Sequence, residues 1–147
     1  MKTVRELIGR QEVIVAFAGQ TVLDAARLMT DKRIGAVPVV DGDRVVGILS
    51  ERDVMNRVVA RQLDPGKTAV EEVMTREVIV GSPTDDVGRV IGIMKQANIR
   101  HLPIVADQKL LGVVSLRALL MVDLDDKADE IKIMTAYIHY IPPSYGS

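Results

Sequence analysis

The segment Ser50-Glu51-Arg52-Asp53 carries the residue types best suited to binding chemistry in this 147-residue chain. It follows an apolar run and is expected to open a helix, whose first backbone N–H groups are unpaired and favour anions. A serine followed three residues later by an acid is also the spacing of a helix capping box. Similar patterns recur at Thr3/Glu6, Thr21/Asp24 and Thr68/Glu71. The segment alone therefore leaves two interpretations open, a binding site and a helix cap.

Residue constellations for catalysis or metal binding are missing from the sequence. There is no cysteine, and the two histidines, His101 and His139, are too few for a His-rich metal site. We find no Ser/His/Asp arrangement, no phosphate-binding Gly-rich loop and no paired catalytic carboxylates. An acidic run lacks the glycine that a calcium loop requires, which favours a solvated helix start (Asp123, Asp125, Asp126, Asp129 and Glu130). We expect neither an enzyme nor a metalloprotein.

The overall composition argues against several classes of partner. Hydrophobic residues make up 48% of the chain, charged residues make up 27%, and the formal net charge is -1. A charge this close to zero gives no general attraction to nucleic acid or anionic lipid. Three tyrosines and one phenylalanine offer little for base stacking. No apolar run approaches the roughly 18 residues of a membrane span, and the charged N-terminus is not a secretory signal. We expect a cytoplasmic protein that binds neither membranes nor nucleic acid.

The sequence contains an internal repeat at an offset of 65 residues, which includes the identical segment EVIV at residues 12–15 and 77–80. Of the 46 pairs formed between residues 12–57 and 77–122, 12 are identical, where ordinary residue usage would give about three. The chain is therefore a tandem repeat of one sequence unit. Because a unit of about 60 residues is only marginally stable alone, we expect the two to pack around a pseudo-two-fold axis. Clefts between them are the natural place for ligands.

Each copy predicts the same order of elements. The predicted strands are Val13–Ala16, 36–40 and 44–49, then Val78–Val80, 102–105 and 110–114. Helices are expected at 22–29 and 87–94, from about Glu51 and Leu116, in the lead-ins 3–8 and 69–74, and at Ala128–Ile141. The fold class is α/β (α+β), with a small three-stranded sheet and flanking helices in each repeat and a C-terminal helix. The predicted boundaries are 3–62 for repeat 1, 63–67 for the linker, 68–125 for repeat 2 and 126–147 for the C-terminal helix and tail.

Two long segments carry a family resemblance, VLDAARLMTDKRIGAVPVVDGDRVVGILSERDV and its weaker partner VGRVIGIMKQANIRHLPIVADQKLLGVVSLRAL. Together with the lead-in VEEVMTREVIV, they resemble a free-standing tandem pair of cystathionine β-synthase (CBS) domains over roughly residues 3–124. The resemblance implies a regulatory module that binds an adenosine-containing ligand between its repeats. AMP, ADP and ATP are the expected ligands, and NAD or S-adenosylmethionine is possible.

The resemblance also implies two sets of site residues. It places Asp53 at the ribose hydroxyls, Ser50 and Arg52 nearer the phosphate, and Thr75 beside the adenine. The full main set is Ile48, Ser50, Arg52, Asp53, Thr75, Val78, Ile79, Ile99, Arg100 and His101. The second set is Ile14, Ile34, Gly35, Val113, Ser115 and Arg117. Arg100-His101 could instead be a solvated strand start.

The second set departs from the family pattern in two places. Ala118 stands where the acid belongs, and Gly35 stands where the first copy would need the counterpart of Arg100. Losing hydrogen bonds to a charged group costs on the order of 1.5–3 kcal/mol. We therefore expect one strong site built on Asp53 and a weak or empty second site.

Two functions of different classes remain open from the sequence. The first is a sensor that signals nucleotide occupancy to an unknown effector protein. The alternative is a constitutive interaction or scaffold module whose clefts are vestigial. The family resemblance favours a homodimer, and an apolar stripe in the predicted terminal helix adds a reason for self-association (Ile131, Met134, Tyr137, Ile138 and Ile141).

Overall fold

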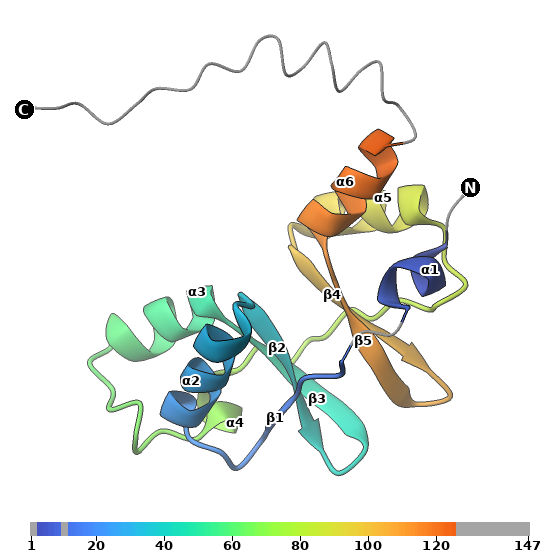
Figure 1. The fold of residues 1–147 in the computed structure, drawn as a ribbon. Helices are drawn as coiled ribbons and strands as arrows, with labels where there is room; N and C mark the ends of the chain where they lie inside the picture. Colours follow the sequence, from blue (N-terminus) through green and yellow to red (C-terminus); the bar gives the residue numbers. More distant parts are fainter. Residues whose placement is uncertain (1–2, 10–11, 126–147) are drawn as a thin grey trace, which may run out of the picture.

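The structure is a computed structural model that describes residues 3–9 and 12–125, and its two halves follow the sequence repeat (Figure 1). The first half of the chain forms α1 (Val4–Ile8), β1 (Ala16–Phe17), α2 (Val22–Lys32), β2 (Ala36–Asp41), β3 (Arg44–Ser50), α3 (Glu51–Val54) and the π-helical segment η1 (Met55–Val59). The second half forms α4 (Val70–Val73), α5 (Val87–Ala97), β4 (His101–Ala106), β5 (Lys109–Ser115) and α6 (Leu116–Asp125). None of the helices in these described ranges is long and apolar enough to cross a membrane.

The main strand pairs of the two halves have the same register. β2 pairs antiparallel with β3, and β4 pairs antiparallel with β5. Both ladders shift register at the matching position, directly after Val39 in the first half and Ile104 in the second. β2, the central strand of its sheet, is buried from Ala36 to Val40 and reads as a continuous apolar run. The 65-residue repeat of the sequence is thus a repeat of hydrogen-bonded structure.

The outer strand differs between the halves. β1 pairs parallel with β2, whereas its counterpart is a single parallel bridge between Gly81 and Ile104. The second sheet therefore has two strands, and the prediction of a third strand at Val78–Val80 was wrong. Gly81 stands where the first half has Ala16, and a Cβ there would lie 2.8 Å from the Leu102 side chain. A glycine adds no side chain to pack and weakens a strand, which accounts for the shortened pairing.

Helices α2 and α5 begin and end at equivalent residues. At the start of α2, the side-chain oxygen of Thr21 accepts a hydrogen bond from the Asp24 N–H at 3.1 Å. Both helices end in a left-handed residue, Arg33 in one and Asn98 in the other, each with φ of 56°. The chain then turns directly into β2 or β4. Arg33 therefore lies in the connection between the end of α2 and the start of β2.

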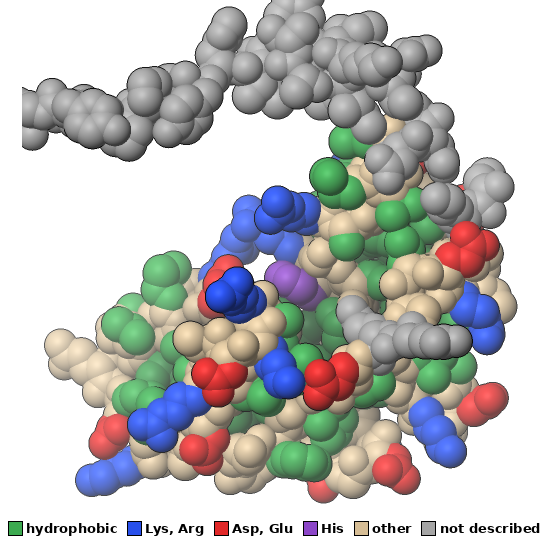
Figure 2. Space-filling view, viewed as in Figure 1, with side chains coloured by type: hydrophobic (Ala, Val, Ile, Leu, Met, Phe, Trp, Pro, Cys, Tyr) green, Lys and Arg blue, Asp and Glu red, His purple; other side chains and the backbone are tan. Residues whose placement is uncertain are grey.

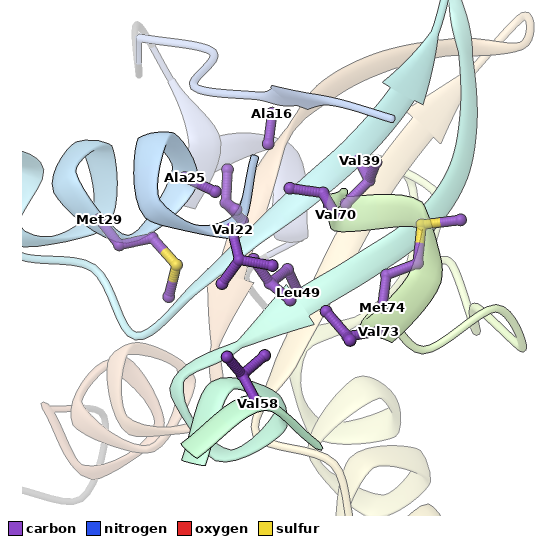
Figure 3. Packing of buried hydrophobic residues seen from close by; sticks show 11 residues of the cluster. Ala16, Val22, Ala25, Met29, Val39, Leu49, Val58, Val70, Val73 and Met74 are labelled. Carbon is purple, nitrogen blue, oxygen red and sulfur yellow. The ribbon is translucent and has the colours of Figure 1, made fainter. Parts of the chain in front are cut away.

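The short lead-in helices are exchanged between the halves. The Val4 N–H donates to the Asp85 carbonyl at 3.0 Å, and the Val70 N–H donates to the Gln20 carbonyl at 2.8 Å. As a result, Val4 and Ile8 of α1 are buried in the core of the second half. Val70, Val73 and Met74 complete the core of the first half (Figure 3). Figure 1 shows α1 beside β5, and α4 packs against β3, a reciprocal arrangement as a pseudo-two-fold pair requires.

The two halves also meet through their sheets, where β3 contacts β5. Both of these strands lead directly into a helix, α3 in the first half and α6 in the second. The junction between the halves is thus built from two strand-to-helix transitions. The predicted C-terminal helix and tail at 126–147 lie outside the described residues.

Candidate functional site

A cleft of about 920 Å³ opens between the two halves. Its size falls within the roughly 300–1,000 Å³ of typical ligand pockets. Figure 2 shows the hollow with a histidine inside it and Lys or Arg side chains around it. The lining from the first half and α1 is Leu7, Ala26, Met29, Thr30, Arg33, Ile34, Gly35, Ala36, Glu51 and Val54. The lining from the second half is Arg100, His101, Val113, Val114, Ser115, Arg117 and Ala118. A ligand in this cleft would touch both repeats.

Two equivalent backbone hydrogen bonds position the polar part of the cleft. The Glu51 N–H donates to the Gly35 carbonyl at 2.9 Å, and the Leu116 N–H donates to the Arg100 carbonyl at 2.8 Å. Each bond ties the first residue of a helix to the residue that leads into a neighbouring strand. The starts of α3 and α6 are therefore fixed against the starts of β2 and β4. This geometry brings Glu51 and Arg117 to one cleft from opposite halves.

The charged side chains of the cleft are mostly positive. Arg33, Arg100 and Arg117 line it together with a single carboxylate, Glu51. Within residues 3–9 and 12–125, no carboxylate oxygen lies within 4.0 Å of these three guanidinium groups. The three arginines against one glutamate leave two positive charges that no described ion pair neutralises. Such a site favours an anionic ligand.

His101 adds a neutral polar group to the same cleft. Burial lowers the pKa of His101 below its usual 6.5, the Glu51 carboxylate opposes this effect, and the Arg100 guanidinium adds to it. The imidazole is therefore neutral at pH 7, when one ring nitrogen donates and the other accepts. Across the described residues, no group of three or more His, Asp or Glu side chains converges to hold a metal ion.

Asp53 lies outside this cleft, in a separate polar cluster. Its carboxylate accepts a hydrogen bond from the Ser50 N–H at 3.0 Å, and the Ser50 hydroxyl accepts one from the Asp53 N–H at 3.1 Å. These two bonds form a capping box, so the cap interpretation of this segment is confirmed. The Thr75 hydroxyl lies 3.2 and 3.3 Å from the two carboxylate oxygens. Asp53 is thereby buried to 9% exposure.

Arg57 extends the cluster towards the segment that leads into the second repeat. Its Nη1 donates to the carbonyls of Val73 and Met74 at 3.0 Å each, and its Nε lies 4.0 Å from the Asp53 carboxylate. Two backbone bonds between Ile48 and Thr75, both 2.9 Å, add β-type pairing at the same place. The cluster thus fastens α3 and η1 to the chain that enters the second half.

The predicted main set is divided by the structure. Four of its residues gather around Asp53: Ile48, Ser50, Asp53 itself and Thr75. Arg100 and His101 instead line the inter-repeat cleft. The remaining four lie elsewhere: Arg52 and Ile79 are exposed, Val78 is half-buried, and Ile99 packs on the second core. The ribose role of Asp53 stays a prediction.

The predicted second set is the one that the cleft gathers. Its members Ile34, Gly35, Val113, Ser115 and Arg117 all line the cleft, whereas Ile14 packs against the first core. Sequence reasoning missed two charged residues of this site, Arg33 and Glu51. The available signal was their position, because Arg33 directly precedes the Ile34-Gly35 pair and Glu51 directly follows Ser50. Glu51 also supplies an acid in a cleft where Ala118 does not.

Comparison with protein families gives matches over both repeats. The family model described as CBS domain matches residues 4–60 and 70–125. Among curated proteins, the CBS domain-containing protein YhcV of Bacillus subtilis is 37% identical over 116 residues, covering 79% of this chain and 81% of its own. The mitochondrial CBS domain-containing protein CBSX3 of Arabidopsis thaliana is 30% identical over 123 residues, and the match spans 60% of its length.

Solved structures show the same arrangement. A protein with CBS domains from Burkholderia ambifaria matches with a TM-score of 0.76 and 29% identity, over 97% of this chain and all of its own. The CBS domain pair of protein MJ0100, solved with 5-methylthioadenosine and S-adenosyl-L-methionine, matches with a TM-score of 0.77 and 25% identity. That match covers 86% of this chain and 98% of the other.

Proposed function

Because this chain belongs to the CBS domain family and carries two CBS domains in tandem, we propose that it binds an adenosine-containing ligand between them and signals its presence to a partner protein. Modules of this family commonly bind adenosine ligands, and none of the matched families or names indicates an enzyme. We propose a nucleotide of the AMP, ADP or ATP type as the ligand. The methylthioadenosine and S-adenosylmethionine of MJ0100 belong to that protein.

The inter-repeat cleft is the observation that carries this proposal. It combines an apolar wall, which includes Met29 and Val113, with the charged groups of Arg100 and Arg117. Pockets of this kind, mostly apolar with a few convergent polar groups, are the usual form of small-molecule sites. A nucleotide fits this chemistry because its base is flat and apolar-faced while its phosphate is anionic. His101 would offer either a donor or an acceptor to the sugar or the phosphate.

Signalling follows from where the cleft lies. Its walls come from both halves, so a bound ligand favours those relative positions of the repeats in which both can touch it. Binding shifts a conformational equilibrium only to the extent that the ligand prefers one state. A cleft lined by residues of both halves meets this condition, because a ligand that touches both walls loses contacts when their relative position changes. We propose that the partner protein reads this change.

The test is isothermal titration of AMP, ATP, NAD and S-adenosylmethionine into the wild-type protein and two variants. Arg117→Gln probes the cleft, and Asp53→Asn probes the predicted ribose site while keeping an oxygen that can accept the Ser50 N–H. Arg27→Gln, exposed on α2 and outside the cleft lining, is the matched control. We expect micromolar binding of at least one nucleotide that Arg117→Gln weakens and the control does not, and weaker binding in Asp53→Asn would in addition support the predicted ribose role. The absence of any heat or thermal shift with all four ligands would overturn the proposal.

A constitutive interaction module is the second candidate function, and exposed apolar side chains on two helical segments favour it. Met55 and Val59 of η1 are 58% and 67% exposed, and Met121 of α6 is 57% exposed. Exposed large apolar side chains mark an interaction surface where they are contiguous, as Met55 and Val59 on the short segment η1 would be. On this alternative, self-association or partner binding would be independent of nucleotide. Titration calorimetry with ATP separates the two functions, because only the sensor predicts that the protein binds the nucleotide.

A further inference from the structure

We propose that the C-terminal segment of this chain, residues 126–147, folds back onto the outer face of α6 and covers Met121. The occupant of that face is therefore the chain itself, and the contact is an antiparallel pair of helices. This inference goes beyond the proposed function, because the contact forms with or without a ligand.

Helix α6 buries one face and leaves apolar side chains on the other. Leu119 is fully buried in the second core, and Leu116 and Leu120 pack against that core. Residues three apart share a helix face, so Ala118 and Met121 lie together on the opposite side, where Ala118 is exposed and Met121 is 57% exposed. Figure 2 shows hydrophobic side chains gathered over α6. The outer face of α6, defined by Ala118 and Met121, is therefore an apolar surface.

The segment after α6 has the apolar pattern that can cover such a face. A helix is predicted at 128–141, and it carries large apolar residues along one side, namely Ile131, Met134, Tyr137, Ile138 and Ile141. Isolated helices of this length are marginal in water, so the stripe needs a surface to pack on. The predicted helix would be about 21 Å long, against about 15 Å for α6, and can cover its whole length.

The path of the chain favours α6 as that surface. α6 ends at Asp125, and only residues 126 and 127 separate it from the predicted helix. A connection of this length joins the antiparallel helices of an αα-hairpin. Residues equally far from the turn then face one another, which places Ile131 and Met134 against Met121. A tether this short also gives the segment an effective concentration at α6 on the order of millimolar.

A second copy of the chain is the competing occupant of this face. A helix about 15 Å long and about 10 Å wide presents a footprint of roughly 150 Å², whereas a stable interface buries about 800 Å² on each partner. A dimer would therefore need contacts beyond the outer face of α6. The tethered segment needs no such addition, because its effective concentration offsets much of the cost of association.

Methionine oxidation tests the proposal with a matched reporter in the same molecule. Dilute hydrogen peroxide converts a methionine to its sulfoxide and is itself reduced to water, and peptide mass spectrometry of the full chain gives the rate at each residue. Met55 and Met121 are 58% and 57% exposed. If the segment docks, Met121 reacts more slowly than Met55, by about fivefold when about 80% of the molecules are docked. Buried methionines report any loss of folding, namely Met29, Met74 and Met94.

Two variants assign the protection of Met121 to the segment. Ile138→Asp places a charge on the apolar stripe and should raise the oxidation rate of Met121 about fivefold. Ala136→Asp adds the same charge on the opposite side of the predicted helix and should leave that rate unchanged. The rate at Met55 should be the same in all three proteins, and protection of Met121 should not depend on protein concentration.

Three results would overturn the inference. The first is an oxidation rate at Met121 that Ile138→Asp does not raise. The second is an equal increase in Ala136→Asp, which would indicate a general effect of the added charge. The third is protection of Met121 that is lost on dilution, which would assign the outer face of α6 to a second copy of the chain.

Discussion

Replacing Asp53 by alanine is expected to destabilise the protein by about 2 kcal/mol, whatever its role in binding. The carboxylate accepts a hydrogen bond from the Ser50 N–H at 3.0 Å and lies 3.2 Å from the Thr75 hydroxyl. At 9% exposure, it leaves little room for water to replace these partners. The prediction follows from the capping box and the threonine contact alone.

The magnitude can be divided between the two contacts. Loss of the hydrogen bond from the Ser50 N–H, the reciprocal half of the capping box, costs about 1 kcal/mol, and a hydrogen bond to a charged acceptor contributes about 1.5 kcal/mol before discounting the half-exposed Thr75. Thr75→Val should therefore cost about 1 kcal/mol. Because Asp53→Ala has already removed that bond, the double variant should lose little more unfolding free energy than Asp53→Ala alone. The expected coupling energy is about 1 kcal/mol.

The assay is urea unfolding followed by circular dichroism for the wild type, the two single variants and the double variant. Asp43→Ala, in the exposed turn after β2, is the control and should change stability by less than about 0.5 kcal/mol. If the losses of unfolding free energy in the two single variants simply add in the double variant, Asp53 and Thr75 do not interact, and the proposed stabilising contact is wrong. The same instability makes Asp53→Asn the better variant for ligand titrations.

Two further predictions concern packing and protonation. Gly47→Ala should destabilise by about 1–3 kcal/mol, because a Cβ there would meet the Met74 sulfur and lie 2.9 Å from the Thr75 carbonyl oxygen. Gly92→Ala in α5 should stabilise by about 0.5–1 kcal/mol, since nothing lies within 4 Å of that Cβ. Urea unfolding checks both glycine variants, and a Gly47→Ala protein more stable than Gly92→Ala would contradict these predictions. Because burial lowers the pKa of His101, an NMR titration should place its midpoint below 6.5. The folded state then binds fewer protons than the unfolded state, so His101 contributes stability above pH 6.5 that is lost as the pH falls towards its lowered pKa. His101→Gln should weaken the dependence of the free energy of unfolding on pH in this range. An unchanged pH dependence would contradict the argument.

The sequence predicted those parts of the structure that depend on the repeat. An offset of 65 residues carries over into matching strand registers and matching helix ends, because hydrogen-bond ladders are set by local patterns of apolar and turn residues. The sequence could not predict that α1 packs with the second half and α4 with the first. The apolar stripes of two similar short helices fit either core, so only the path of the connecting chain decides.

The candidate site was predicted in outline and divided differently by the structure. The residues that resemble the family motif were identified, but Arg100 and His101 lie with the second set instead of with Asp53. A linear motif does not show which wall of a cleft a strand start will face. The charge of the cleft depends on Arg33, whose position follows from a left-handed helix end that many residue types could occupy.

The short helix α3 joins the two polar regions of the molecule. Its first residue, Glu51, lines the cleft, and its third, Asp53, holds Thr75 at the start of the second repeat. One turn later, Arg57 binds two carbonyls of the same connecting segment. Because these residues lie on one continuous helical stretch, we expect a ligand that displaces Glu51 to strain the bonds made by Asp53 and Arg57 as well. We therefore expect occupancy of the inter-repeat cleft to affect the connection between the repeats through residues 51–57.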